Sequence, residues 1–314
     1  MLGLRRDLAY GLLCACALLV ALLFSGSAIV AQITAPSSDE FEYRINQVAR
    51  SLQSNPRLKK LSQAQREGVV NFITGNMGFV MLHELGHAAV AEFQLPVIGR
   101  EEDGADDFAI VQLLRAGSAF SHRVLVEAAK GWFLSDLRDR NDKEPLYFFD
   151  EHGLDKQRAY SIVCIMVGSD PTGFKDLADE TKLPDDRQRT CKRDYDKAVS
   201  GWDAVLKSYR RGADQPKTKI DVVYGDGQGK YDAYAAAFRS LRLLDVVAER
   251  AADLLAWPLP FTLETKTCGF INGQWIGPEH RLVLCYELAA DFAELYRDYN
   301  DKLMQTKRKG KSKR

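Results

Sequence analysis

The first 31 residues have a hydrophobic pattern unlike that of the rest of the chain. Two arginines precede an apolar run over residues 8–30, and small residues, Ala28 and Ala31, stand near its end. A positive start, an apolar middle and a small-residue exit are typical of a secretory signal peptide. The run is also long enough to span a bilayer, so an uncleaved anchor is the alternative. We therefore predict an exported protein, periplasmic or secreted, which associates with the membrane if residues 8–30 stay attached.

Beyond this segment the pattern is mostly helical. Apolar residues dominate over 77–93 without a proline, which predicts a buried helix that ends before Pro96. Just upstream, residues 69–76 fit either a strand or a helix, and Ser62 with Gln65 form an S-x-x-Q capping-box pattern. Further helices are expected over about residues 40–60, 103–116, 122–137, 191–210, 231–257 and 288–303, and a helix or a strand over 158–168.

One region near the C-terminus has a β pattern instead. Residues 261–270 and 280–288 are rich in β-branched and apolar residues, and turn signals separate them, among them Asn272-Gly273. Two such runs with a turn between them predict a β-hairpin. The expected fold class is therefore α+β and predominantly α-helical, with a small C-terminal hairpin or sheet.

Length and composition indicate how this body is divided. The chain has 314 residues, of which 46% are hydrophobic, enough for one substantial core. We expect a single domain over residues 32–303, after the N-terminal segment 1–31 and before a disordered basic tail, residues 304–314. The tail carries six Lys or Arg residues without interleaved aromatic residues, so no nucleic-acid partner is expected.

The cysteines fit an exported protein. Four lie beyond the N-terminal segment, and an even number in this context predicts two disulfides with three possible pairings. Pairing of nearest neighbours closes short loops and is the arrangement we predict; four buried thiols are the alternative. No C-x-x-C spacing occurs among these residues, which argues against a zinc site made of cysteines. The predicted disulfides are Cys164–Cys191 and Cys268–Cys285.

The pentapeptide HELGH, residues 83–87, lies within the predicted buried helix. Residues four apart share one face of a helix, so His83 and His87 can bind the same ion. Zinc lowers the pKa of its bound water to about 7, and a neighbouring carboxylate can then take the proton. The alternative is a chance coincidence, but it would bury three polar side chains without compensation. We therefore predict Zn²⁺ as the cofactor, the two histidines as ligands, and Glu84 as the general base.

A third ligand is expected from the acidic cluster that follows HELGH. Glu102 and Asp106 are four residues apart and can share a helical face. Glu102 is the predicted ligand, and Asp106 is predicted to accept the second N–H of a metal-bound histidine, which orients the ring. A solvated acidic helix start is the alternative. The other carboxylates that compete for these roles are Glu101, Asp103 and Asp107.

Two resemblances rest on these motifs. HELGH followed by E-x-x-A-D-x-x-A, residues 102–109, resembles the gluzincin pattern of zinc peptidases. More broadly, "HELGHAAV", "LPVIGREEDGADDFA", "HGLDKQRAYSIVCIMVGSDP", "LPDDRQRTC" and "LVLCYEL" resemble a bacterial family of exported metallopeptidases that is classed as a domain of unknown function. The resemblance covers nearly the whole mature chain. It implies a zincin-like peptidase fold around HELGH, and it implies no particular substrate.

A further similarity concerns Asn272-Gly273-Gln274-Trp275. It resembles the N-A-x-Y segment of neprilysin-like peptidases, with Gly273 in place of Ala and Trp275 in place of Tyr. In those enzymes the segment binds the substrate backbone at a sheet edge and precedes the zinc helix, whereas here it follows that helix. The similarity therefore implies a circularly permuted fold in which Asn272 binds a peptide by strand addition. A plain disulfide-linked hairpin is the alternative.

Peptide hydrolysis also requires a donor for the tetrahedral oxyanion. His152, in the polar segment "FDEHGLD", is the first candidate for this catalytic role, and His280 is the second. The alternative for both is an ordinary surface histidine.

Two function hypotheses follow from these residues. The first is a zinc-dependent peptidase of the cell envelope or exterior, acting on a peptide or protein, in which Glu84 passes a proton from water to the leaving amine. The second is a non-catalytic binding or structural protein of the envelope on a zincin scaffold. A binding protein has no need of a base, so Glu84 favours the enzyme.

Overall fold

The computed structural model describes residues 38–54 and 58–311. The chain divides into two units, residues 1–34 and 35–314, and all described residues belong to the second. The predicted signal or anchor therefore lies outside the described residues. In the described part of the chain, no helix combines the length and the apolar character that crossing a membrane requires.

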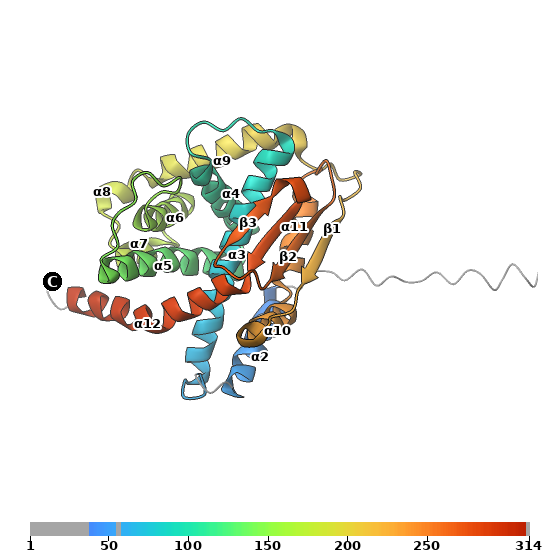
Figure 1. Ribbon diagram of the computed structural model, residues 1–314. Helices are drawn as coiled ribbons and strands as arrows, with labels where there is room; N and C mark the ends of the chain where they lie inside the picture. Colours follow the sequence, from blue (N-terminus) through green and yellow to red (C-terminus); the bar gives the residue numbers. More distant parts are fainter. Residues whose placement is uncertain (1–37, 55–57, 312–314) are drawn as a thin grey trace, which may run out of the picture. The chain divides into compact units, whose positions relative to one another are not determined.

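The described unit is α-rich and contains one small sheet, as the α+β prediction required (Figure 1). Its helices are α2 (Ser38–Ser51), η1 (Leu52–Ser54), α3 (Gln63–Phe93), α4 (Glu101–Ala116), α5 (Ala119–Asp142), α6 (Asp155–Ser169), α7 (Lys175–Thr181), α8 (Asp185–Gln188), α9 (Cys191–Leu206), η2 (Lys207–Tyr209), η3 (Gly229–Tyr231), α10 (Asp232–Leu241), α11 (Leu243–Leu254), η4 (Gly277–Glu279) and α12 (Tyr286–Lys311). Its strands are β1 (Ile220–Tyr224), β2 (Phe261–Lys266), β3 (Gly273–Ile276) and β4 (Arg281–Cys285).

Helix α3 is the longest element and lies at the centre of the unit. The predicted capping box is confirmed, because the Ser62 hydroxyl accepts from the Gln65 N–H and the Gln65 side chain accepts from the Ser62 N–H. Residues 69–76, which fitted a strand or a helix, are helical, and α3 ends at Gln94 in the left-handed conformation (φ 50°). Its buried residues occur on several faces, as expected for a helix surrounded by other elements.

The sheet has the strand order β1-β2-β4-β3. Strands β1, β2 and β4 are parallel, and β3 pairs antiparallel with β4 at one edge. The predicted hairpin between residues 261–270 and 280–288 is wrong, because these segments form β2 and β4, which are parallel neighbours. The hairpin consists of β3 and β4. The sequence pattern did not indicate the short strand β3, because it lies among the turn residues between the two apolar runs.

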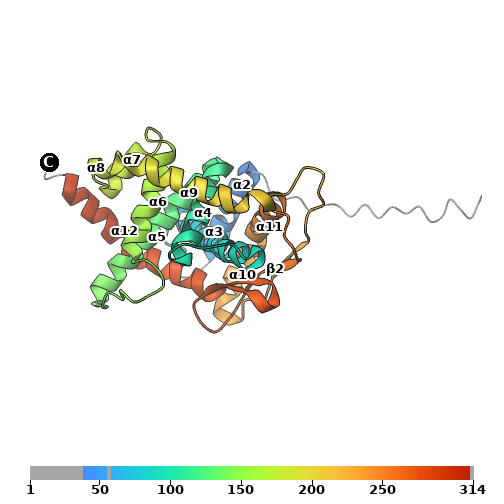
Figure 2. The ribbon, with the colours of Figure 1, turned by 90° about the horizontal axis from the view of Figure 1, so that it is seen from above.

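Helix α3 separates two parts of the hydrophobic core. One cluster joins α3 to α2, α10, α11 and the sheet, and the other joins it to α4, α5, α6 and α9. Figures 1 and 2 show the same division, with α5, α6, α7 and α8 on one side of α3 and the sheet with α10 and α11 on the other. Helix α3 therefore lies between the sheet on one side and helices α4, α5, α6 and α9 on the other.

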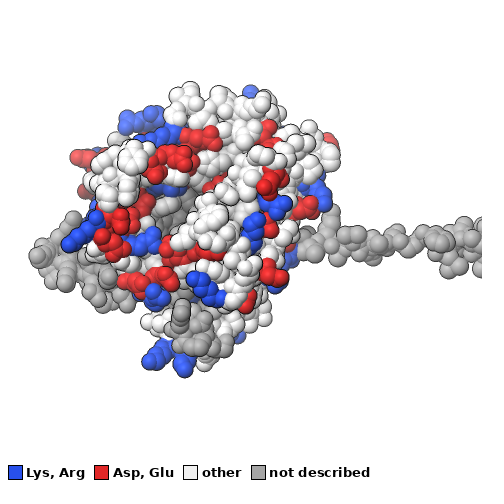
Figure 3. Space-filling view, in the orientation of Figure 1, with Lys and Arg blue, Asp and Glu red and all other residues white. Residues whose placement is uncertain are grey.

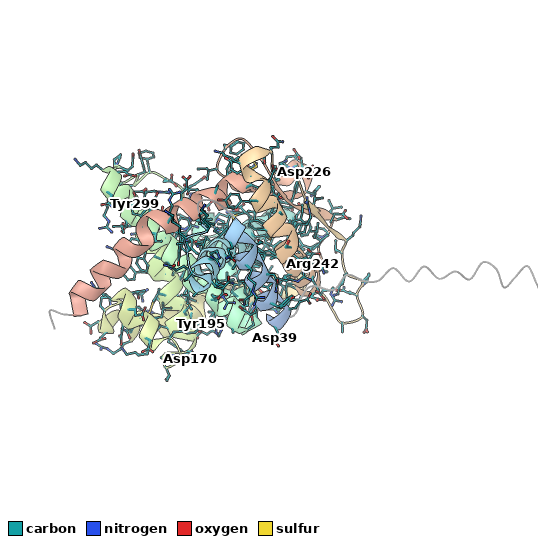
Figure 4. All side chains as sticks on the ribbon, turned by 90° about the horizontal axis from the view of Figure 1, so that it is seen from below. Asp39, Asp170, Tyr195, Asp226, Arg242 and Tyr299 are labelled. Carbon is teal, nitrogen blue, oxygen red and sulfur yellow. A yellow bond between two sulfur atoms is a disulfide. The ribbon has the colours of Figure 1, made fainter. Side chains whose placement is uncertain are left out.

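Three elements differ from the prediction in their extent. The expected helix over 231–257 is two helices, because Arg242, labelled in Figure 4, adopts the left-handed conformation (φ 56°) between α10 and α11. Strand β1 was not predicted; it is only five residues long, and its burial alternates between half-buried and exposed. Helix α12 continues through residues 304–311 of the expected tail. The division of the chain at residues 31 and 303 stays a prediction.

Both predicted disulfides are present, which confirms the pairing of nearest neighbours. Cys164–Cys191 joins α6 to the start of α9, and Cys268–Cys285 joins the β2–β3 loop to the end of β4. The buried carboxylate of Glu287 accepts hydrogen bonds from the backbone N–H groups of Cys268 and Gly269 in the same loop. Disulfides are characteristic of oxidising compartments, so the two bonds fit an exported protein.

We expect replacement of both Cys164 and Cys191 by alanine to lower the free energy of unfolding by about 2–4 kcal/mol, because the unfolded chain then loses a cross-link. The two residues are 27 positions apart. Urea unfolding of the parent and the variant, each with and without reductant, measures the effect. Reductant should destabilise the parent more than the variant, and an identical midpoint for the parent under both conditions would contradict the prediction.

Candidate metal centre

The site forms where α3 and α4 approach each other closely. A Cβ atom placed on Gly86 would lie 3.1 Å from the Ala105 Cα and 3.3 Å from the Phe108 Cβ. A side chain at position 86 would therefore push the two helices apart. Gly86, the fourth residue of HELGH, and the small Ala105 allow a contact that brings acidic residues of α4 to the histidines of α3.

Three donor atoms converge at this contact. The Nε2 atoms of His83 and His87 are 3.1 Å apart, and the Glu102 Oε2 lies 3.0 Å from the first and 3.3 Å from the second. Four donors arranged tetrahedrally at zinc-ligand bond lengths would be separated by about 3.3 Å. The three atoms therefore have the spacing of one face of a zinc site.

The partners of the other ring nitrogens explain why this convergence needs a positive charge. The Nδ1 of His83 is 2.8 Å from the Asp106 Oδ1, and the Nδ1 of His87 is 2.8 Å from the Glu101 Oε1. A carboxylate only accepts hydrogen bonds, so each Nδ1 carries a proton and each neutral ring presents a lone pair at Nε2. These two lone pairs face each other and the Glu102 carboxylate. Either protons or a cation must separate them, and the residues fit a divalent metal ion.

The pKa values at the site reflect the same concentration of negative charge. Burial alone would lower the pKa of His83, but hydrogen bonds to Asp106 and Glu102 outweigh it and raise the pKa. The pKa of His87 rises to about 9, because hydrogen bonds to Glu102 and Glu101 overcome the opposing effect of burial. Burial would raise the pKa of Glu102, yet the surrounding histidines hold it far below its ordinary value. The carboxylates around the two histidines therefore favour positive charge at this site.

Asp106 connects the histidine to a third helix. Its carboxylate accepts from the Arg158 Nη2 at 2.7 Å and from Nε at 2.8 Å, in addition to His83. Arg158 comes from α6, and its guanidinium also lies 3.8 Å from the centre of the Trp132 ring. Asp106 is buried, and burial favours its neutral form, but His83 and Arg158 together lower its pKa. The carboxylate thus stays charged and fixes the orientation of the His83 ring.

Arg158 was not predicted from the sequence. It stands at the start of the apolar segment over residues 158–168, for which we expected a helix or a strand, and the structure buries it. A buried guanidinium requires a carboxylate partner, and this requirement was the signal that would have linked it to the acidic cluster.

His152 reaches the same carboxylate from the α5–α6 loop. Its Nε2 lies 2.9 Å from the Glu102 Oε2, and ligand atoms of His83, Glu102 and His152 all lie within 4.8 Å of one another. Asp150 positions the ring, because its Oδ1 accepts from the His152 backbone N–H at 2.8 Å and lies 3.1 Å from Nδ1. The hydrogen bond to Glu102 raises the pKa of His152. The structure therefore brings the predicted catalytic histidine to the predicted metal ligand.

Glu84 faces the edge of the sheet. Its Oε2 accepts from the Trp275 backbone N–H of β3 at 2.9 Å. Burial raises the pKa of Glu84, while His83 and His87 act in the opposite direction. A carboxylate with a raised pKa is a stronger proton acceptor than an exposed one, which suits a general base.

The remaining candidates lie apart from this convergence. His280 lies 2.8 Å from the Glu92 Oε1. The Asn272 carbonyl accepts from the Cys285 N–H, so it points into the sheet, and the Asn272 amide donates to Gln274. Of the competing carboxylates, Glu101 contacts the Nδ1 of His87 and not the point where the three donor atoms meet. Asp107 interacts electrostatically with Asp103, Asp106 and Asp194 of α9.

Asp107 gives a pH-dependent stability that can be measured. Its pKa rises to about 7, because this half-buried carboxylate is partly desolvated and lies near Asp106, Asp103 and Asp194. The folded chain thus holds this proton more tightly than the unfolded chain, and stability is lost as the pH rises from about 4 to about 7.

We expect Asp107→Asn to remove this loss, so that the variant gains about 1–3 kcal/mol over the parent between about pH 4 and pH 8. Urea unfolding of both proteins across this range is the measurement. Parallel stability curves would contradict the prediction.

Comparison with known proteins agrees with this geometry. A family model described as "Putative metallopeptidase" matches residues 43–206, more than half of the chain. The match includes every residue that converges on Glu102, whereas the sheet and α12 lie outside it. No curated protein and no solved structure matches the chain. A family of metallopeptidases implies a hydrolase with a metal cofactor, and the chain belongs to this family.

Proposed function

We propose that the protein is an exported zinc-dependent peptidase. The observation that carries the proposal is the convergence of the His83 Nε2, the His87 Nε2 and the Glu102 Oε2 within 3.0–3.3 Å of one another. Two imidazoles and one carboxylate on successive helices are the ligand set of a zinc peptidase site that leaves a position for water. When bound there, zinc would polarise a substrate carbonyl and lower the pKa of water to about 7.

In this proposal Glu84 transfers the proton. The Trp275 N–H occupies its Oε2, so Oε1 is left to accept a proton from the attacking water and to deliver it to the leaving amine. The hydrogen bond also fixes the carboxylate relative to the edge of the sheet. A base that is held on one side and buried on the others needs little reorganisation during the reaction.

In this proposal His152 acts on the substrate carbonyl. It lies on the α5–α6 loop, its Nε2 is 2.9 Å from the Glu102 Oε2, and its side chain is about 40% exposed. The hydrogen bond to Glu102 raises its pKa, which favours a proton on Nε2 that can be donated to the oxyanion of the tetrahedral intermediate. Asp150 then stabilises the positive charge on the ring.

Strand β3 offers a place for the substrate backbone. The Asn272 carbonyl is hydrogen-bonded to Cys285 at the end of β4. Alternate residues of an antiparallel strand bond to the neighbouring strand, so the backbone groups of Gln274 also point toward β4. Those of Gly273 and Trp275 point away from the sheet. An extended peptide can add to this edge next to Glu84. The similarity to neprilysin-like peptidases implied that Asn272 binds the peptide; in this proposal the outward backbone groups of Gly273 and Trp275 take that role, since the Asn272 carbonyl is bound to Cys285.

We expect about one zinc per purified chain, retained in Glu84→Gln and lost in His87→Ala. Glu84→Gln should lower kcat about 10³-fold or more with little change in zinc content, because the amide cannot accept a proton. Elemental analysis and peptide cleavage, measured on the same preparations, test both parts. A Glu84→Gln variant as active as the parent would exclude Glu84 as the base, and would favour a binding role if neither protein cleaves.

Asp106→Asn should weaken zinc binding by about 10–100-fold, because the His83 ring loses the carboxylate that orients it. Competition with a chelating dye measures the affinity. The neighbouring Asp107→Asn is the matched control, since Asp107 makes no contact with the histidines in the described structure and should leave the affinity unchanged. Equal losses in the two variants would show a general effect on α4.

A further inference from the structure

A cavity of about 1120 Å³ adjoins the candidate metal centre. It is lined by the C-terminal half of α5, the α5–α6 loop, the first turns of α6 and the turn before α8. His152 belongs to this lining and also contacts Glu102. A substrate bound beside the metal centre can therefore extend a side chain into the cavity.

The walls of the cavity combine apolar surface with acidic groups. Leu183 is buried, Tyr160 is half-buried, and Leu146 and Tyr147 of the loop are exposed. Figure 3 shows Asp and Glu side chains gathered around the C-terminal end of α5, with Lys and Arg among them. Among the described residues, five carboxylates and four Lys or Arg side chains line the cavity.

Most of the cationic side chains are bound to other carboxylates. Arg158 is bound to Asp106 at 2.7 Å, and Arg187 is bound to Asp194; neither acid belongs to the cavity. The guanidinium of Arg140 lies 2.7 Å from Asp136. Lys156, the fourth cation, is exposed to solvent.

Three carboxylates of the lining, Asp139, Glu144 and Asp155, lie in the same part of the cavity wall. The pKa of Asp155 is raised by burial, in spite of a hydrogen bond from Ser135 and the opposing charges of Arg158 and Arg138. The pKa of Asp139 is raised by burial and by its neighbours Asp155 and Glu144, and its contact with Arg138 is 3.9 Å long. A cation placed among Asp139, Glu144 and Asp155 would relieve this repulsion.

We propose that the cavity is a specificity pocket that takes the side chain of a lysine or arginine next to the scissile peptide bond. This inference rests on the proposed peptidase function. A long aliphatic stem matches the apolar walls, and a terminal charge matches the carboxylates. An uncharged apolar side chain would fill the same volume but would leave the acidic group without a partner, and an acidic side chain would be repelled.

The experiment compares lysine with norleucine, which has an aliphatic stem of similar length and no charge. In a set of otherwise identical alanine-rich peptides, the lysine or norleucine moves one position at a time. Binding to the zinc-loaded Glu84→Gln protein is measured by calorimetry, and cleavage by the parent is measured by mass spectrometry. At one position next to the cleaved bond, lysine should bind about tenfold more tightly than norleucine.

The variant Asp139→Asn/Asp155→Asn should abolish this preference, and Asp196→Asn is the matched control. Asp196 is exposed on α9, pairs with Lys192 and lies outside the cavity lining, so the preference should persist. If the double variant does not fold, Glu144→Gln on the exposed loop should reduce the preference instead.

The outcomes separate the pocket from the peptidase function. Cleavage without a preference for lysine or arginine, or a preference that survives in the double variant, overturns the pocket and leaves the function standing. A zinc-loaded parent that cleaves no peptide overturns the function, and the binding comparison still decides the pocket: equal affinities for lysine and norleucine refute it, and tighter lysine binding that depends on Asp139 and Asp155 supports it.

Discussion

Three electron-pair donors that face one another are the constraint on which the site depends. The histidine Nδ1 atoms are bound to carboxylates, so the two Nε2 lone pairs and the Glu102 oxygen meet at 3.0–3.3 Å. Such an arrangement is repulsive unless a positive charge lies within it. The spacing matches a small divalent ion with tetrahedral preference, and the surrounding carboxylates already favour cations, since they raise the pKa of His87 to about 9.

The helical packing holds these donors in place against their repulsion. Asp106 binds His83 of α3 and Arg158 of α6 from its own position on α4, so one buried carboxylate links three helices. The contact between α3 and α4 is closest at Gly86, where a larger residue would meet Ala105. The disulfide between α6 and α9 adds a covalent link to the same group of helices. These contacts hold the three donor atoms at fixed distances from one another.

The sequence was sufficient for features that depend on local spacing. HELGH, the capping box at Ser62 and the four-residue interval from Glu102 to Asp106 each lie within one helix, where the spacing fixes the geometry. The disulfides were predictable because pairing of nearest neighbours closes the short loops. The features that were missed depend on contacts between distant segments. Arg158 is 52 residues from Asp106 in the sequence. Strands β2 and β4 are parallel neighbours, and the short β3 between them in the chain pairs with the other side of β4. No periodicity in a single segment reports such partners.

The link between Glu84 and Trp275 spans 191 residues and joins two parts of the chain with different roles. The residues that converge on the metal position all lie in the part that matches the family model, while the N–H that holds the base comes from a strand beyond it. The Cys268–Cys285 disulfide and the Glu287 carboxylate fix the loop that leads into this strand. In the proposed mechanism, metal binding depends on the packing of α3 against α4 and on Arg158 of α6, which holds Asp106. Hydrolysis would require in addition that the sheet be folded against α3, because the Trp275 N–H that binds Glu84 comes from β3. The position of the strand after the helix in the chain, rather than before it, changes neither requirement.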